Sequence, residues 1–122
     1  MGQTGVFGFP GDMDASVFLA GHWQRRALFC PQALDAAAWT IEPEDLLSVA
    51  MEDAVSARLV TRNEQGFVLE NGPFAEERLD DLPDSAWSVL VQAMEVWEPR
   101  YHGLIALFDF LPRWRIDDVM IS

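Results

Sequence analysis

An acidic pair near the C-terminal end of the sequence, Asp117-Asp118, is the feature best suited to binding a ligand. It lies in the segment 114–122, whose alternation of apolar and polar residues predicts a strand with Asp118 on the same face as apolar neighbours. A carboxylate in such surroundings needs a cation or hydrogen-bond donors. Two interpretations of Asp118 follow: an internal salt bridge, for instance with Arg113 or Arg115, or a rigidly held carboxylate that binds a basic ligand.

The other residues able to do chemistry form no recognisable site. His22 and His102 are distant in the sequence, and neither has the spacing of a metal-ligand pair. Cys30 is the single cysteine, which excludes an intrachain disulfide, and its apolar neighbours indicate a buried structural thiol. The serines lack the surroundings of a nucleophile elbow, and the glycine-rich segment 2–11 lacks the ending of a phosphate-binding loop. We predict no catalytic residue and no metal ligand within the chain.

The charge of the chain is strongly negative. Its 122 residues include 20 Asp and Glu against 8 basic residues, all of them arginines, and the formal net charge is -12. This charge disfavours direct contact with the phosphates of nucleic acid and favours a basic partner. A solvated acidic surface with no such partner is the alternative.

The size and composition predict one soluble domain. The chain is long enough for a single core, and 50% of its residues are apolar. No apolar run approaches the roughly 20 residues that a membrane-spanning helix needs. The N-terminus lacks the basic and apolar regions of a secretory signal, so we predict a cytoplasmic protein.

The elements that would position the acidic pair are helices and strands in alternation, which indicates an α+β fold. Asp14 can cap a helix over 15–23, and Pro43 suits the first residue of a second helix that ends near Asp53. Apolar residues at helical spacing predict a helix over 85–97, and Pro99 begins a further helix that stops before Pro112. Strands are predicted at 26–30, at 56–62 and 67–70 as a hairpin around the turn 63–66, and at 114–122, with an acidic loop at 76–84.

The predicted C-terminal strand stops without a turn or a cap. A strand that ends at its most apolar point leaves an unpaired edge, which promotes association with other chains. We therefore expect a truncated piece of a larger domain and self-association of the isolated chain. A homodimer remains an open alternative.

Five segments of the chain carry a resemblance to a known family, in the family's order and spacing. They are HWQRR at 22–26, SARLV at 56–60, GPF at 72–74, WSVLVQ at 87–92 and LPRWRIDDVMIS at 111–122. Over 14–122 the chain thereby resembles the N-terminal part of the bacterial ribosomal oxygenases, cupin-like JmjC-type enzymes that hydroxylate an arginine of a large-subunit ribosomal protein. The family usually has Lys-Arg-Pro where this chain has Arg-Arg-Ala at 25–27. Residues 1–13 match nothing in it, and we expect a flexible segment there.

The resemblance implies a jelly-roll, also called a double-stranded β-helix, of which this chain would supply helices and the first strands. It also implies Fe(II), held by two His and one Asp, and 2-oxoglutarate as cosubstrate. In the family those ligands follow the segment that 111–122 matches, so none is assigned to this chain. We expect the 122 residues alone to bind neither cofactor and to be inactive.

The resemblance places the acidic pair at the mouth of the family's active site. Asp118 would then bind the guanidinium of the target arginine, because a carboxylate accepts both N–H groups of that planar fork. Asp117, Arg115 and Trp114 would have structural roles around it. The competing interpretation is a non-enzymatic acidic module that docks a basic protein.

Overall fold

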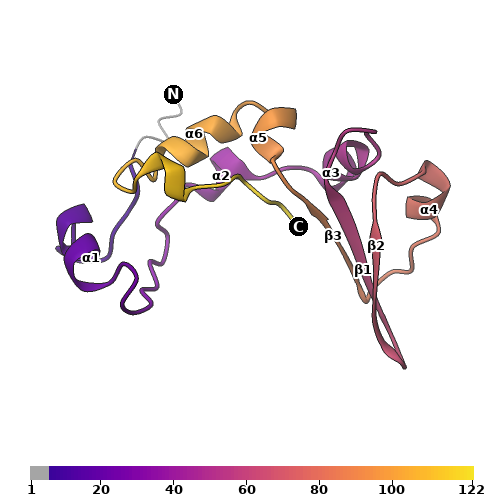
Figure 1. The fold of residues 1–122 in the computed structure, drawn as a ribbon, viewed down its shortest axis with the longest axis horizontal. Coiled ribbons are helices and arrows are strands. Elements are labelled where there is room, and N and C mark those ends of the chain that lie inside the picture. The colour runs from indigo at the N-terminus through magenta and orange to yellow at the C-terminus, as the bar shows by residue number, and fades with distance from the viewer. Residues whose placement is uncertain (1–5) are drawn as a thin grey trace. The chain divides into compact units, whose positions relative to one another are not determined.

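The computed structural model describes residues 6–122 (Figure 1). The chain divides into two compact units. The first contains the chain up to Thr40 together with His102–Ile116, and the second contains Ile41–Tyr101 together with Asp117–Ser122. The acidic pair belongs to the second unit, which also contains the sheet.

The second unit is built on a three-stranded antiparallel sheet in the order β2-β1-β3 (Figure 1). Its strands are β1 (Ala57–Asn63), β2 (Gly66–Asn71) and β3 (Trp87–Val91). The predicted hairpin is confirmed: β1 and β2 are joined by a two-residue turn, and Gly66 has a φ of 119°, which glycine adopts without strain. The structure thus has the predicted mixture of helices and antiparallel strands.

One face of the sheet carries the core of this unit. Leu59 and Val91 are fully buried there, and α3 (Pro43–Ala50) packs against β3 with Leu46 and Ala50 turned inward. Pro43 is the first residue of α3, as predicted, and acidic residues in its first turn complement the helix dipole. The helix ends at Ala50 and not near residue 53.

The predicted helix over 85–97 is wrong. This segment forms β3 followed by the short helix α5 (Met94–Trp97). Ala86 and Ala93, on either side of β3, have left-handed backbone conformations with φ of 68° and 55°, which interrupt a continuous helix. Pairing with β1 buries Val89 and Val91, and this tertiary pairing outweighs the helical spacing of the apolar residues.

Three further predictions are corrected. Residues 26–30 form no strand, and the acidic loop at 76–84 contains α4 (Glu76–Asp80). The ion pair of Arg78 with Glu70 of β2, 2.6 Å between Nη2 and Oε2, and the burial of Leu79 hold α4 in place. The strand expected over 114–122 is replaced by the 3₁₀ turn η1 (Arg113–Arg115) and an extended segment that makes a single bridge to β3.

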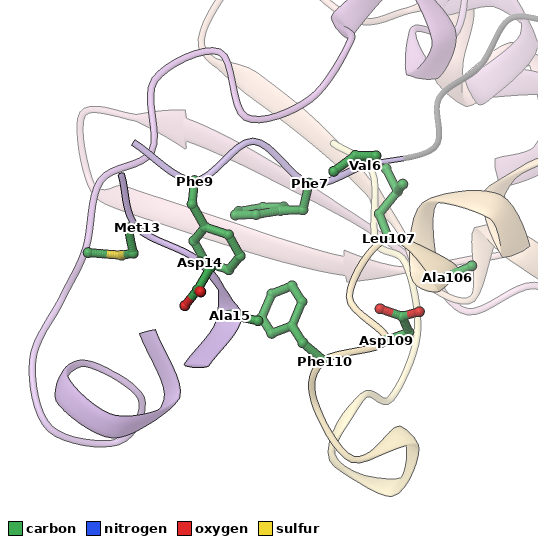
Figure 2. A pocket seen from close by; sticks show the side chains of 10 residues that line it. All are labelled: Val6, Phe7, Phe9, Met13, Asp14, Ala15, Ala106, Leu107, Asp109 and Phe110. Carbon is green, nitrogen blue, oxygen red and sulfur yellow. The ribbon is translucent and has the colours of Figure 1, made fainter. Parts of the chain in front are cut away.

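The first unit contains short helices and a cluster of aromatic rings. Its helices are α1 (Ala15–Gly21), α2 (Ala36–Trp39) and nearly all of α6 (Tyr101–Ala106). The predicted cap of α1 is confirmed, because Asp14 Oδ1 accepts the Val17 N–H at 2.9 Å. The clustered rings are Phe7, Phe9, Phe18, Phe108 and Phe110. Three of these rings, Phe7, Phe9 and Phe110, line a cavity of about 390 Å³ (Figure 2).

The flexible segment expected over 1–13 stays a prediction. Residues 1–5 lie outside the described part, and Phe7 and Phe9 belong to the aromatic cluster. Within residues 6–122, none of the helices has the length and apolar character needed to cross a bilayer.

The exposed apolar residues of β2 predict that the isolated chain self-associates. Phe67 and Leu69 share one face of this edge strand and are 76% and 58% exposed. We expect sedimentation velocity to show concentration-dependent oligomers, and a double substitution of Phe67→Lys and Leu69→Lys to shift the chain to monomer. Val17→Lys, at an exposed position of α1, is the control and should leave association unchanged. A wild-type monomer at high concentration would contradict this expectation.

Candidate functional site

The acidic pair lies in an extended segment, residues 116–122, which follows η1. Asp117 is exposed and Asp118 is half-buried. The two side chains thus differ in their access to solvent. The predicted alternation is not regular, however, because Trp114 and Met120, expected on the face of Asp118, are 78% and 49% exposed. Ile121 alone forms a bridge, exchanging hydrogen bonds of 2.8 and 3.0 Å with Val91 at the end of β3.

The carboxylate of Asp118 is held by a backbone donor. The Ala93 N–H donates to Asp118 Oδ2 at 3.0 Å, and this is the one hydrogen bond of that carboxylate among the described residues. Ala93 is the left-handed residue between β3 and α5. The other carboxylate oxygen, Oδ1, therefore remains available as an acceptor.

The next residue, Val119, is fixed by both of its backbone polar groups. Its N–H donates to Glu95 Oε1 at 3.0 Å, and its carbonyl accepts the Met94 N–H at 2.9 Å. Glu95 is only 8% exposed and Met94 is fully buried. Three consecutive residues, 93 to 95, therefore fix residues 118 and 119 by one hydrogen bond each.

The two arginines considered as partners of Asp118 have other interactions within the first unit. Arg113 Nη1 donates to the Ile116 carbonyl at 2.8 Å. The Arg115 guanidinium lies 5.5 Å from the ring centre of Trp23 and 5.4 Å from that of Trp114, at cation–π distance. Trp114 is itself 78% exposed. Asp118 thus satisfies its need for a donor through a backbone amide.

Arg58 on β1 is a nearby cation that the sequence reasoning missed. Its Nη2 donates to Gln92 Oε1 at 3.4 Å and lies 3.8 Å from Met120 Sδ, and its Nε is buried without a partner among the described residues. Glu95 was also missed. The signal was the single charge within the apolar run from Val89 to Trp97, where an unpaired carboxylate would be costly.

The sequence offered three further residues able to do chemistry: Cys30, His102 and His22. Cys30 is a half-buried free thiol, and His102 is exposed. His22 stacks with Phe18, with ring centres 6.3 Å apart, and its Nδ1 is buried without a partner in the described part of the chain. Across residues 6–122, no three His, Cys, Asp or Glu side chains gather as metal ligands would.

Comparison with known proteins identifies the class to which this fold and segment correspond. Over nearly its whole length the chain is similar to part of bacterial ribosomal oxygenases. It is 39% identical over 105 residues to the ribosomal protein uL16 3-hydroxylase of Escherichia coli K12. This alignment covers 86% of the chain and 28% of that protein. It is 34% identical over 117 residues to a probable ribosomal oxygenase of Haemophilus influenzae. This alignment covers 95% of the chain and 29% of that protein. No family model matches the chain.

Solved structures show the same relationship in the fold. The structure of YcfD, a ribosomal oxygenase from E. coli, aligns with a TM-score of 0.80 and 32% identity over 95% of this chain and 31% of that one. A complex of YcfD with cobalt and 2-oxoglutarate also aligns with a TM-score of 0.80, at 33% identity. The helices and three-stranded sheet are thus similar in fold to part of a ribosomal oxygenase structure, as predicted. This chain spans about 30% of the length of these relatives.

The left-handed residue Ala93 predicts how the site responds to glycine. Glycine adopts this conformation without the Cβ clash, and Ala93→Gly retains the N–H that Asp118 accepts. We expect the substitution to leave the free energy of unfolding unchanged or to raise it by up to about 1 kcal/mol. Ala20→Gly, inside α1, should lower it by roughly 0.5 to 1 kcal/mol. Chemical denaturation checks both, and a larger loss for Ala93→Gly than for Ala20→Gly would contradict the conformation.

Proposed function

We propose that this chain is the substrate-facing, N-terminal part of a jelly-roll oxygenase that uses Fe(II) and 2-oxoglutarate to hydroxylate an arginine of a large-subunit ribosomal protein in the cytoplasm. The observation that carries the proposal is the similarity to YcfD, at a TM-score of 0.80 over 95% of the chain. One curated relative is a uL16 3-hydroxylase, and solved structures of YcfD are complexes with cobalt and either succinic acid or 2-oxoglutarate.

The described residues do not fit the metal of such an enzyme. They bring together no group of three His, Cys, Asp or Glu side chains, so the proposal assigns neither iron nor 2-oxoglutarate ligands to residues 6–122. The role that we assign to this chain is to bind and orient the substrate side chain.

Asp118 is the residue that we assign to the substrate arginine. Its Oδ2 is held by the Ala93 N–H, and Oδ1 is available to a guanidinium N–H. Half-burial reduces screening by water, which strengthens a charge-assisted hydrogen bond. The net charge of -12 favours the approach of a basic ribosomal protein. Asp117, Arg115 and Trp114 are assigned structural roles.

The competing proposal is an acidic module that binds a basic protein without catalysing a reaction. The same net charge favours it, and it requires no cofactor. The two proposals differ in how a longer protein carrying this chain behaves. Turnover of 2-oxoglutarate with hydroxylation of an arginine peptide supports the oxygenase, whereas tight binding without turnover supports the module.

Substituting Asp118 tests the substrate contact. Asp118→Asn keeps an oxygen acceptor for the Ala93 N–H and removes the negative charge. In a longer enzyme that carries this chain, we expect catalytic efficiency toward an arginine peptide to fall by about 30- to 1,000-fold, corresponding to roughly 2 to 4 kcal/mol. Steady-state kinetics and a melting curve on the same variant measure the two effects separately.

Asp117→Asn is the matched control, because it removes the same charge from the neighbouring residue, whose side chain is exposed. It should lower efficiency far less. Intact kinetics for Asp118→Asn would refute the contact with substrate. A lowered melting temperature with unchanged efficiency per folded molecule would show instead that Asp118 is purely structural.

The chain by itself should bind no Fe(II) together with 2-oxoglutarate and should not hydroxylate an arginine peptide. The reason is that the described residues offer no facial arrangement of metal ligands. Metal titration of the purified 122 residues, followed by calorimetry and by mass spectrometry of the peptide, is the measurement. Stoichiometric, 2-oxoglutarate-dependent iron binding would place ligands within this chain and contradict the proposal.

A further inference from the structure

We propose that Glu95 is a positioning residue for Asp118 and thereby determines selectivity for a cationic side chain. This inference rests on the proposed function of Asp118 as the arginine contact. Glu95 does not touch the ligand. It acts through the backbone of Val119, the residue next to Asp118.

The burial of Glu95 is the first observation. It is the one buried side chain with a charge among residues 6–122, at 8% exposure. A buried carboxylate is costly unless strong hydrogen bonds compensate it. Its Oε1 accepts the Val119 N–H at 3.0 Å, so this carboxylate is directed at the backbone of the acidic segment.

The placement of that bond relative to Asp118 is the second observation. The Val119 nitrogen belongs to the peptide plane that begins at the Asp118 carbonyl carbon, so a fixed Val119 N–H fixes the backbone dihedral ψ of Asp118. The Met94 N–H holds the next carbonyl, at 2.9 Å from the Val119 oxygen. The backbone on the C-terminal side of Asp118 is therefore fixed on both sides of Val119.

The side chain of Asp118 is fixed by a separate bond, from the Ala93 N–H to Oδ2 at 3.0 Å. Because the backbone of Asp118 and one oxygen of its carboxylate are both held, the side chain has lost most of its rotational freedom before a ligand arrives. A preorganised acceptor does not lose that entropy on binding, so the ligand is bound more tightly. Without the Glu95 bond, the segment would be held on this side by the Met94 bond and, two residues further along, by the bridge of Ile121 to Val91.

Two substitutions distinguish the effect of the position of the Glu95 acceptor from the effect of its charge. Glu95→Gln keeps an oxygen at the same distance along the side chain and loses the charge. Glu95→Asp keeps the charge and withdraws the acceptor by one methylene. Positioning predicts that Gln preserves the site and Asp impairs it, whereas a general electrostatic effect predicts the opposite order.

The experiment measures binding of two peptides to the 122-residue chain, at concentrations where sedimentation shows a monomer. One labelled basic peptide contains a single arginine, and the second has neutral citrulline in its place. The readout is the ratio of their dissociation constants by fluorescence anisotropy. We expect the wild type to prefer arginine by at least tenfold, Asp118→Asn to reduce the ratio to near one, and Glu95→Asp and Glu95→Ala to reduce it at least fivefold.

Glu95→Gln should keep the ratio within threefold of the wild type. Leu46→Ala, in the core of the same unit on α3, controls for lost stability, because it lowers the melting temperature and leaves the hydrogen bonds of residues 93–95 with 118–119 in place. It should leave the ratio unchanged at a temperature where every variant is folded. If Glu95→Ala does not fold, the pair Glu95→Gln and Glu95→Asp still decides the question.

The outcomes separate this inference from the proposed function. A wild-type ratio near one, or an unchanged ratio for Asp118→Asn, overturns the arginine contact and the inference with it. A reduced ratio for Asp118→Asn with unchanged ratios for Glu95→Ala and Glu95→Asp overturns the positioning role alone. A reduced ratio for Leu46→Ala equal to that of Glu95→Ala would show that the effect of Glu95 is general loss of stability, which also overturns it.

Discussion

Two backbone N–H groups at the start of α5, those of its N-cap Ala93 and its first residue Met94, hold the C-terminal segment. β3 ends at Val91 and α5 begins at Met94, so neither the sheet nor the helix supplies acceptors for them. An unpaired buried donor costs about 1 to 3 kcal/mol. Asp118 Oδ2 and the Val119 carbonyl are those acceptors. The segment is therefore fixed at Asp118 and Val119, and a single bridge at Ile121 joins it to β3 in place of a continuous ladder.

The features that the sequence predicted correctly are those with a local cause. The hairpin follows from a turn with glycine at a positive φ, and the start of α1 follows from the capping side chain of Asp14. Asp118 was identified because a carboxylate among apolar residues needs a donor. Its donor is a backbone amide from a residue 25 positions away, which no local pattern contains.

The features that the sequence did not predict depend on distant contacts. Residues 85–97 have apolar side chains at helical spacing, yet pairing with β1 buries Val89 and Val91 in a strand. Alanine is a strong helix former, and nothing in the sequence indicates that Ala86 and Ala93 adopt left-handed conformations. Glu95 was assigned to the same predicted helix, which concealed its contact with Val119.

A backbone amide and an arginine satisfy a carboxylate in different ways. The amide of Ala93 supplies a hydrogen bond to Asp118 without a compensating positive charge. An internal arginine would have neutralised the carboxylate, but Arg113 and Arg115 interact with a carbonyl and with aromatic rings. Asp118 is thus held by the fold through Oδ2, and under the proposed function its charge would meet the substrate arginine. Since an exposed charge is weakened by water and a fully buried one requires an internal partner, half-burial with a neutral donor is the arrangement that best suits recognition of a cation.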